Sequence, residues 1–246
     1  MAAEQAHSPL GQFEIHTLAP IRLGGIDVSF TNSALFMVVA VLAVTLFLTL
    51  GMRRRAMVPS RWQSLAELSY EFVANMVRDN VGTEGRRYFP FIFTLFMFIL
   101  FANGLGLIPY SFTVTSHIIV TFGLAVVVFV GVTIIGMVKH GLRWFTFFMP
   151  TGVPLYMAPL LVPLEVMSYM ARPVTLALRL FANMMAGHTM LEVFAGFVVA
   201  LGLAAGVAPL AVDVALYGLE VVVAGLQAYV FTILACLYLS DAVHLH

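Results

Sequence analysis

Residues 173–192 read PVTLALRLFANMMAGHTMLE, an apolar helical pattern that carries ionisable side chains where a membrane helix should present hydrocarbon. The strongly polar residues of this stretch are Arg179, Asn183, His188 and Glu192. An ionised group at bilayer depth costs about 2.5–3.5 kcal/mol on insertion scales, so such residues indicate function by default. The fold must therefore supply partners for these side chains.

The composition is that of a polytopic membrane protein. The chain has 246 residues, of which 61% are hydrophobic and 10% charged, whereas a soluble domain carries about 25% charge. The formal net charge is zero, which gives no reason to expect nucleic acid or an acidic substrate. The single cysteine, Cys236, lies in an apolar run, so the sequence predicts neither a disulfide framework nor a metal site.

The apolar runs predict a single membrane domain, residues 33–246, which follows an N-terminal segment, residues 1–32. A hydrocarbon core about 30 Å thick needs about 20 apolar residues for each helix. The predicted spanning helices are 33–52, 88–108 and 118–138, followed by two longer helices, 164–201 and 209–240. Residues 60–81 predict an amphipathic helix in the membrane interface, with a small soluble helical loop as the alternative.

Positive charge is distributed unevenly between the two sides of the membrane. Nine of the twelve Lys and Arg residues fall in segments on one side: Arg53, Arg54, Arg55, Arg61, Arg78, Arg86, Arg87, Lys139 and Arg143. By the positive-inside rule this side is cytoplasmic. We therefore expect the N-terminus outside and the C-terminus in the cytoplasm of a bacterial inner membrane.

Proline and helix length set the shape of the second half of the chain. Four prolines between 144 and 164 predict an irregular or re-entrant segment, and Pro173 predicts a kink. Residues 164–201 would form a helix about 57 Å long, which must break or tilt to fit the bilayer. The predicted fold class is an all-α polytopic membrane protein with upright transmembrane helices, a long, strongly tilted antiparallel helix hairpin and one interfacial amphipathic helix.

Polar residues form stripes on both long helices. On the first, Glu165, Arg172 and Arg179 recur every seven residues and share one face, with Ser168 and Asn183 beside it. His188 lies about 180° around the helix from Arg179 and is predicted to pair with Glu192, at i+4. The second helix carries a stripe in steps of seven or fourteen: Asp213, Glu220, Gln227 and Asp241.

Carboxylates, a histidine and a fixed cation within apolar helices favour a proton path. Carboxyl and imidazole groups take up and release protons, whereas a guanidinium stays charged and forms a permanent positive barrier. The alternative is that these residues serve only as polar contacts between helices.

Three segments resemble subunit a of the F-type ATP synthase membrane sector. They are Arg-Leu-Phe-Ala-Asn-Met-Met-Ala-Gly-His at 179–188, Leu-Gln-Ala-Tyr-Val-Phe at 226–231, and Gly-Leu-Ile-Pro-Tyr-Ser-Phe-Thr-Val-Thr-Ser-His at 106–117. The combination of His188 with Glu220 looks like the bacterial and mitochondrial form of that family. The resemblance covers nearly the whole chain from about residue 10.

The resemblance implies a stator that forms two offset half-channels against a rotating ring of c subunits, each with a buried carboxylate. Arg179 matches the essential arginine, which favours the deprotonated ring carboxylate and blocks a direct leak. The other positions that match the family's proton path or polar surroundings are Glu220, His188, Gln227, Asn183, Glu165 and Ser168, and Glu192 is added from its helical pairing. The implied partners are the c-ring, peripheral-stalk b-type subunits, other ATP synthase subunits, membrane lipid and protons.

Two other classes of function remain as alternatives. A self-contained secondary transporter or antiporter often contains inverted repeats, and the two halves of this chain show no convincing repeat. A structural membrane anchor would use the polar residues only to hold helices together. A catalytic site in this chain is not expected, since the sequence lacks a nucleophile–base set, a phosphate-binding glycine loop and a metal cluster. We therefore expect no direct ATP binding and no cofactor.

Overall fold

The computed structural model describes residues 13–20, 22–23, 26–27, 29–53, 59–108, 111–148 and 157–244. The predicted N-terminal segment 1–32 and the predicted irregular segment 144–164 lie partly outside these residues. Within the described residues the α-helices are α1 (Asn32–Gly51), α2 (Arg61–Val81), α3 (Phe89–Gly106), α4 (Ile118–His140), α5 (Ala158–Ala205) and α6 (Val207–Val243). Three 3₁₀ helices connect them: η3 (Thr83–Arg87), η4 (Val114–Ser116) and η5 (Gly141–Phe148).

The all-α polytopic fold class is confirmed. Five helices, all except α2, are long and apolar enough to cross a membrane. The short strands β1 (Thr17–Ala19) and β4 (Phe30–Thr31) pair antiparallel before α1, as do β2 (Arg22–Leu23) and β3 (Ile26–Asp27). The sequence analysis did not predict these strands.

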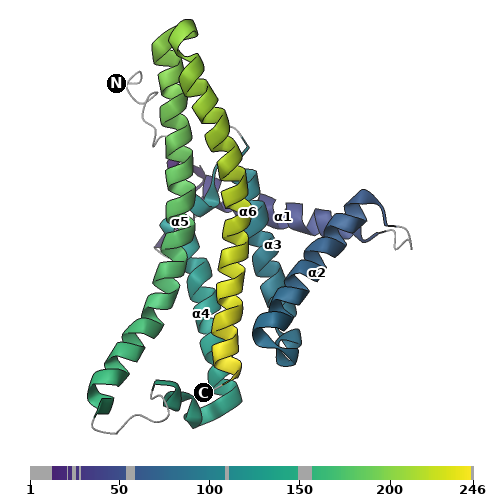
Figure 1. Cartoon of the computed structure of the whole chain (residues 1–246), viewed down its shortest axis with the longest axis vertical. Helices are drawn as coiled ribbons and strands as arrows, with labels where there is room; N and C mark the ends of the chain where they lie inside the picture. Colours follow the sequence, from purple (N-terminus) through teal and green to yellow (C-terminus); the bar gives the residue numbers. More distant parts are fainter. Residues whose placement is uncertain are drawn as a thin grey trace.

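The hairpin of α5 and α6 forms the long axis of the molecule, and α1 runs across it (Figure 1). The 45 residues from Ala158 to Gly202 span about 68 Å, more than twice the hydrocarbon thickness, whereas the 20 residues of α1 span about 30 Å. When α1 stands upright in the bilayer, the hairpin therefore lies strongly tilted.

One prediction about proline is wrong: α5 begins at Ala158 and is helical through Pro163, within the segment 144–164 that was predicted to be irregular. Pro173 also lies inside α5, and Figure 1 shows this helix changing direction in its first half, as the predicted kink requires. The non-helical backbone inside α5 occurs at Gly202. Pro159 sits in the first turn of α5, where a helix leaves its backbone N–H groups unpaired and tolerates proline.

The turn between α5 and α6 depends on two glycines. Gly202 has a φ of +70°, in the region that glycine enters without steric cost. A Cβ atom on Gly206 would lie 2.6 Å from the carbonyl oxygen of Gly202 and 2.8 Å from that of Val198. These two positions let the chain reverse tightly at this end of the hairpin.

Four helices contact α6, namely α2, α3, α4 and α5, and the interior of the bundle lies between them and α6. Its largest buried side chains include Ile92 and Ile99 of α3, Leu176 and Leu180 of α5, and Phe231 of α6. These residues hold one face of α5 and α6 against the bundle and leave the other face of each helix exposed.

The amphipathic helix α2 buries one side on the bundle and exposes apolar side chains on the other. Val73 and Val77 are buried, whereas Trp62, Leu65 and Leu68 are exposed. Ser60 caps the helix by accepting a hydrogen bond from the backbone N–H of Gln63. Exposed apolar residues on a helix too polar to span the bilayer are typical of an interfacial helix.

Close packing at the end of α4 yields a stability prediction. A Cβ atom on Gly136 would lie 2.6 Å from Nε1 and 2.8 Å from Cδ1 of Trp144, which is buried. We expect Gly136→Ala to destabilise the protein by about 1–3 kcal/mol in thermal unfolding in detergent, because overpacking forces side chains from their positions. Gly123→Ala on the same helix is the control, since its Cβ meets no atom within 4 Å, and it should be neutral or stabilising. Equal unfolding temperatures for the two variants would contradict the close packing of Trp144 against Gly136.

Candidate functional site

Arg179 lies on the exposed face of α5, within a membrane-spanning segment. Its neighbours Leu176 and Leu180 point into the core, which turns the guanidinium outward. Among the residues that the structure describes, none forms a hydrogen bond or an ion pair with it. Arg179 is thus a permanent cation without a counter-ion in the described part of the chain.

Arg172, two turns earlier on the same stripe, is paired with other side chains of this chain. Its Nη1 donates to Oδ2 of Asp241 at 2.8 Å, and its guanidinium carbon lies 5.0 Å from the ring centroid of Tyr238 and 5.4 Å from that of Tyr169. The ion pair and the aromatic faces neutralise and shield the charge. Arg172, which had no clear role in the sequence, therefore joins the first half of α5 to the end of α6.

His188 is brought together with Glu220 and Thr113. Its Nε2 lies 2.9 Å from the hydroxyl of Thr113 and 3.6 Å from Oε1 of Glu220. Glu220 is only 5% exposed, and neither of its carboxyl oxygens has a hydrogen-bond partner within the described part of the chain. A buried acid beside an imidazole and a hydroxyl is an arrangement that can pass a proton.

Gly187 makes room for the Glu220 side chain. A Cβ atom at this position would lie 2.6 Å from Oε1 and 3.0 Å from Cδ of Glu220. The absence of a side chain on Gly187 therefore lets the carboxyl of α6 reach His188 on α5.

The partner of His188 predicted from helical spacing is wrong, whereas the combination that the family resemblance implied is present. Spacing assigned Glu192, four residues along α5, but among the described residues the acid within 4 Å of His188 is Glu220 of the opposing helix. A spacing rule for one helix does not include side chains of the second helix, because the axial register of the two helices depends on their turn.

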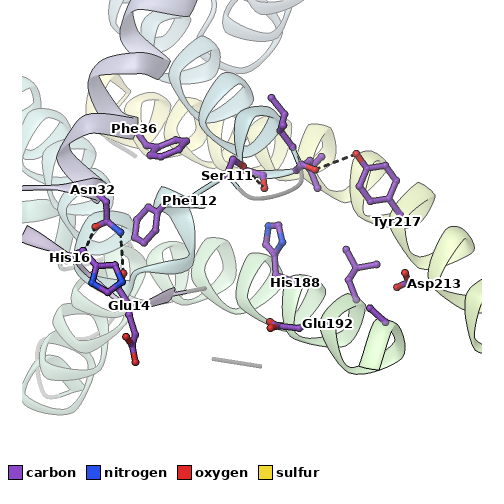
Figure 2. A pocket seen from close by; sticks show the side chains of 15 residues that line it. Glu14, His16, Asn32, Phe36, Ser111, Phe112, His188, Glu192, Asp213 and Tyr217 are labelled. Atoms are coloured by element: carbon purple, nitrogen blue, oxygen red, sulfur yellow. Dashed lines mark hydrogen bonds between the residues drawn. The ribbon is translucent and has the colours of Figure 1, made fainter. Parts of the chain in front are cut away.

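A cavity of about 740 Å³ opens beside His188. Figure 2 shows His188 and Glu192 of α5 on one side of it and Asp213 and Tyr217 of α6 nearby. Tyr217 donates a hydrogen bond to the carbonyl of Leu107 at 3.2 Å, which ties α6 to the end of α3. The polar side chains among the lining residues can hydrogen-bond water beside His188.

The N-terminal segment forms part of the cavity wall. Asn32 donates through Nδ2 to the carbonyl of Glu14 at 3.0 Å and accepts from the backbone N–H of His16 at 3.2 Å (Figure 2). The carbonyl of Phe13 lies 3.0 Å from Nε2 of His117, and the Phe13 ring meets the His188 ring edge-on at 6.4 Å. These contacts hold Glu14 and His16 at the cavity.

A second polar contact joins the two long helices between Arg179 and His188. Asn183 donates through Nδ2 to Oε1 of Gln227 at 2.9 Å. Gln227 is buried, and its Nε2 has no hydrogen-bond partner in the described residues. Farther into the bundle, Asn103 donates to the carbonyl of Ala224 and accepts from Thr115.

Glu165 and Ser168 lie apart from the other predicted residues, in the first turns of α5. Glu165 is partly buried and Ser168 is exposed, and neither has a hydrogen bond or an ion pair with another described residue. They are 14 and 11 residues before Arg179, whereas His188 is nine residues after it. The predicted site residues thus lie on both sides of Arg179 along one helix.

The residues missed by the sequence analysis come from outside the long hairpin. Thr113 reaches His188 across 75 positions of chain, and Glu14 and His16 reach the cavity from the N-terminal segment. Their polarity was visible in the sequence, but no periodicity linked them to α5. Across the described ranges, no group of three or more His, Cys, Asp or Glu residues is arranged to hold a metal ion.

Comparisons with known proteins consistently point to one family. The family model "ATP synthase A chain" matches residues 34–240. The ATP synthase subunit a of Pelagibacter ubique is 57% identical over 98% of this chain and 99% of its own length. The ATP synthase subunit a of Parvibaculum lavamentivorans is 58% identical over 96% of this chain and 93% of its own length. That of Rhodospirillum rubrum is 55% identical over 98% of this chain and 100% of its own length.

The contact between Asn183 and Gln227 yields a prediction for stability. Asn183→Leu removes the one hydrogen bond that the Gln227 side chain makes within the described residues, and we expect a loss of about 0.5–2 kcal/mol in thermal unfolding in detergent. The double variant Asn183→Leu/Gln227→Leu should recover much of this loss, because both polar groups are then replaced by apolar ones. Strictly additive losses in this double-mutant cycle would show that the two side chains do not interact.

Proposed function

This chain belongs to the ATP synthase A chain family, and from that premise we propose that Arg179 separates two offset proton half-channels beside a ring of c subunits. The chain is the proton-translocating stator subunit of a rotary F-type ATP synthase. The assignment of individual residues to the path rests on the geometry described above.

The exposed, unpartnered guanidinium of Arg179 is the observation that carries the proposal. A charge in the hydrocarbon region is tolerated when it meets a counter-charge, and within the described residues this chain supplies one to Arg172 but none to Arg179. A carboxylate on a neighbouring polypeptide supplies the missing partner. As a ring carboxylate passes, Arg179 favours its deprotonated form and blocks direct proton flow between the two sides.

The outer half-channel is the cavity that ends at His188. A proton entering past Glu14 and His16 reaches Glu192 and the His188–Glu220 pair, with Thr113 hydrogen-bonded to the imidazole. His188 and Glu220 then exchange it with the ring carboxylate. Asn183 and Gln227, between this pair and Arg179, fix the spacing of the two helices along the path.

The inner half-channel follows the first turns of α5, where Glu165 and Ser168 are placed. Along α5 Glu165 lies about 21 Å before Arg179 and His188 about 14 Å after it. Because these groups lie on opposite sides of Arg179, a proton leaves the first half-channel bound to a ring carboxylate. It reaches the second half-channel when the ring rotates. A transmembrane potential supplies about 2.3 kcal/mol for each proton per 100 mV.

The proposed function also implies the partners of this chain and its orientation in the membrane. The proposed partners are the c-ring, the peripheral-stalk b-type subunits and the other ATP synthase subunits, with no ATP bound and no reaction catalysed by this chain itself. The uneven distribution of Lys and Arg supports an N-terminus outside and a C-terminus in the cytoplasm of the bacterial inner membrane. No observation favours the alternative of a self-contained transporter.

Replacement of the fixed cation tests the proposal. We expect Arg179→Ala to lower ATP synthesis driven by a proton gradient at least about a hundredfold, since it removes the preorganised charge that the ring carboxylate meets. The measurement is ATP synthesis in inverted membrane vesicles, with the amount of assembled complex determined in parallel. Arg61→Ala, which removes an exposed cation from the start of α2, is the control and should leave synthesis unchanged. Normal synthesis by Arg179→Ala would refute the mechanism.

The spacing of His188 and Glu220 is tested at Gly187. We expect Gly187→Ala to lower proton flux about tenfold to a hundredfold, because the new methyl group displaces the Glu220 carboxyl from His188. Gly196→Ala on the same helix is the matched control, as its Cβ meets no atom within 4 Å. Flux is measured as ATP-driven acidification of inverted vesicles with equal amounts of complex. Unchanged flux in Gly187→Ala would show that this contact lies off the path.

A further inference from the structure

A second cavity of about 770 Å³ lies between η3 and the last turns of α4, and none of its lining residues belongs to the proposed proton path. We call it the η3–α4 cleft. It combines the cations Arg86 and Arg87 of η3 and Lys139 of α4 with an apolar surface on α4, Ile134 and Val138. A cleft with this combination fits a ligand that has an anionic head and an apolar body.

The charges in the η3–α4 cleft leave an excess of two cations. Lys139 is hydrogen-bonded to Glu84, and its ammonium group holds the pKa of that carboxyl below the usual value. Arg86 and Arg87 are exposed and form no hydrogen bond or ion pair with any other described residue. Two adjacent guanidinium groups are therefore available to a ligand, and guanidinium binds phosphate in a bidentate manner.

The depth of the cleft in the membrane follows from the helices that form it. The spanning helix α3 begins at Phe89, directly after the two arginines, and the apolar run of α4 ends at Lys139. Both helices therefore reach the headgroup region at this point. Val138 is 81% exposed and Ile134 53% exposed, so the apolar surface continues along α4 toward the hydrocarbon.

A smaller cavity of about 510 Å³ extends the basic region around η3. Thr83 and Arg86 line both cavities, and the smaller one adds Arg78, whose Nη2 donates a hydrogen bond to the uncharged amide of Asn75. Its apolar side is formed by Phe89 and Pro90 at the start of α3, among other residues. Arg86 thus stands between two spaces that each combine a cation with an apolar surface.

We propose that the η3–α4 cleft binds an anionic phospholipid, with its phosphate on Arg86 and Arg87 and its acyl chains along Ile134 and Val138. Basic pockets between transmembrane helices at headgroup depth bind anionic lipid heads in this way. A free phosphate ion would use the arginines but leave the apolar surface without a partner. The bound lipid would join the α2–α3 connection to the end of α4.

The test uses the intact ATP synthase purified in detergent, with lipid binding measured by native mass spectrometry. The probes are phosphatidylglycerol, phosphatidylcholine and the water-soluble glycerol 3-phosphate. We expect the wild type to bind phosphatidylglycerol more tightly than either of the other two. We expect Arg86→Gln/Arg87→Gln to bind it about thirtyfold more weakly, because each basic side chain near an anionic lipid contributes about fivefold.

Two further variants keep the result interpretable. Arg61→Gln removes an exposed cation that lines neither cavity, and it should bind phosphatidylglycerol like the wild type. Arg86→Lys/Arg87→Lys keeps both charges and should retain most of the binding even if the glutamine variant assembles poorly.

Three outcomes would overturn the proposal. Equal affinity for phosphatidylglycerol and phosphatidylcholine would show that the arginines do not select the ligand. Equal affinity for glycerol 3-phosphate would show a simple anion site without acyl chains. Loss of a peripheral-stalk subunit from Arg86→Gln/Arg87→Gln, with no phosphatidylglycerol bound to the wild type, would show that a protein fills the cleft.

Discussion

A fixed positive charge in hydrocarbon needs a counter-charge, and this constraint separates the two arginines of α5. Arg172 and Arg179 lie two turns apart on one stripe. The chain neutralises Arg172 with Asp241 and the ring of Tyr238, whereas Arg179 is turned outward without a partner among the described residues. Since an unpaired charge is costly, the proposed function assigns the missing counter-charge of Arg179 to another polypeptide. In that proposal the first arginine stabilises the hairpin, and the second acts on the ring carboxylate.

The close approach of α5 and α6 brings polar residues of the two helices into contact, and the proposed proton path depends on these contacts. Gly187 lets the carboxyl of Glu220 cross to His188, and Asn183 bonds to Gln227 one turn before Gly187. Both contacts join residues that periodicity assigned to separate stripes. The N-terminal segment lines the cavity beside them with Glu14 and His16, so residues outside the helical bundle form part of its wall.

Periodicity predicted the helices and the polar stripes because both depend on a repeat of 3.6 residues within one segment. The contacts that complete the site depend instead on the register between segments. Thr113 and His188 are 75 positions apart, and Arg172 and Asp241 are 69 apart. Pro173 also shows the limit of local rules. A long helix packed on both α4 and α6 stays helical past a proline, although its axis changes direction in its first half (Figure 1), because tertiary contacts outweigh the lost backbone hydrogen bond.

The tilt of the hairpin determines whether polar groups on both sides of Arg179 can serve one ring. Glu165 and His188 are 23 residues apart, about 35 Å along the axis. In an upright helix that distance exceeds the hydrocarbon thickness, so both groups would sit at headgroup depth and need no channel. In a tilted helix both groups lie within the hydrocarbon, at different positions along the circumference of a ring. Water must then reach each by its own cavity, and Arg179 lies between them. The offset of two half-channels therefore follows from helix length once the hairpin is tilted.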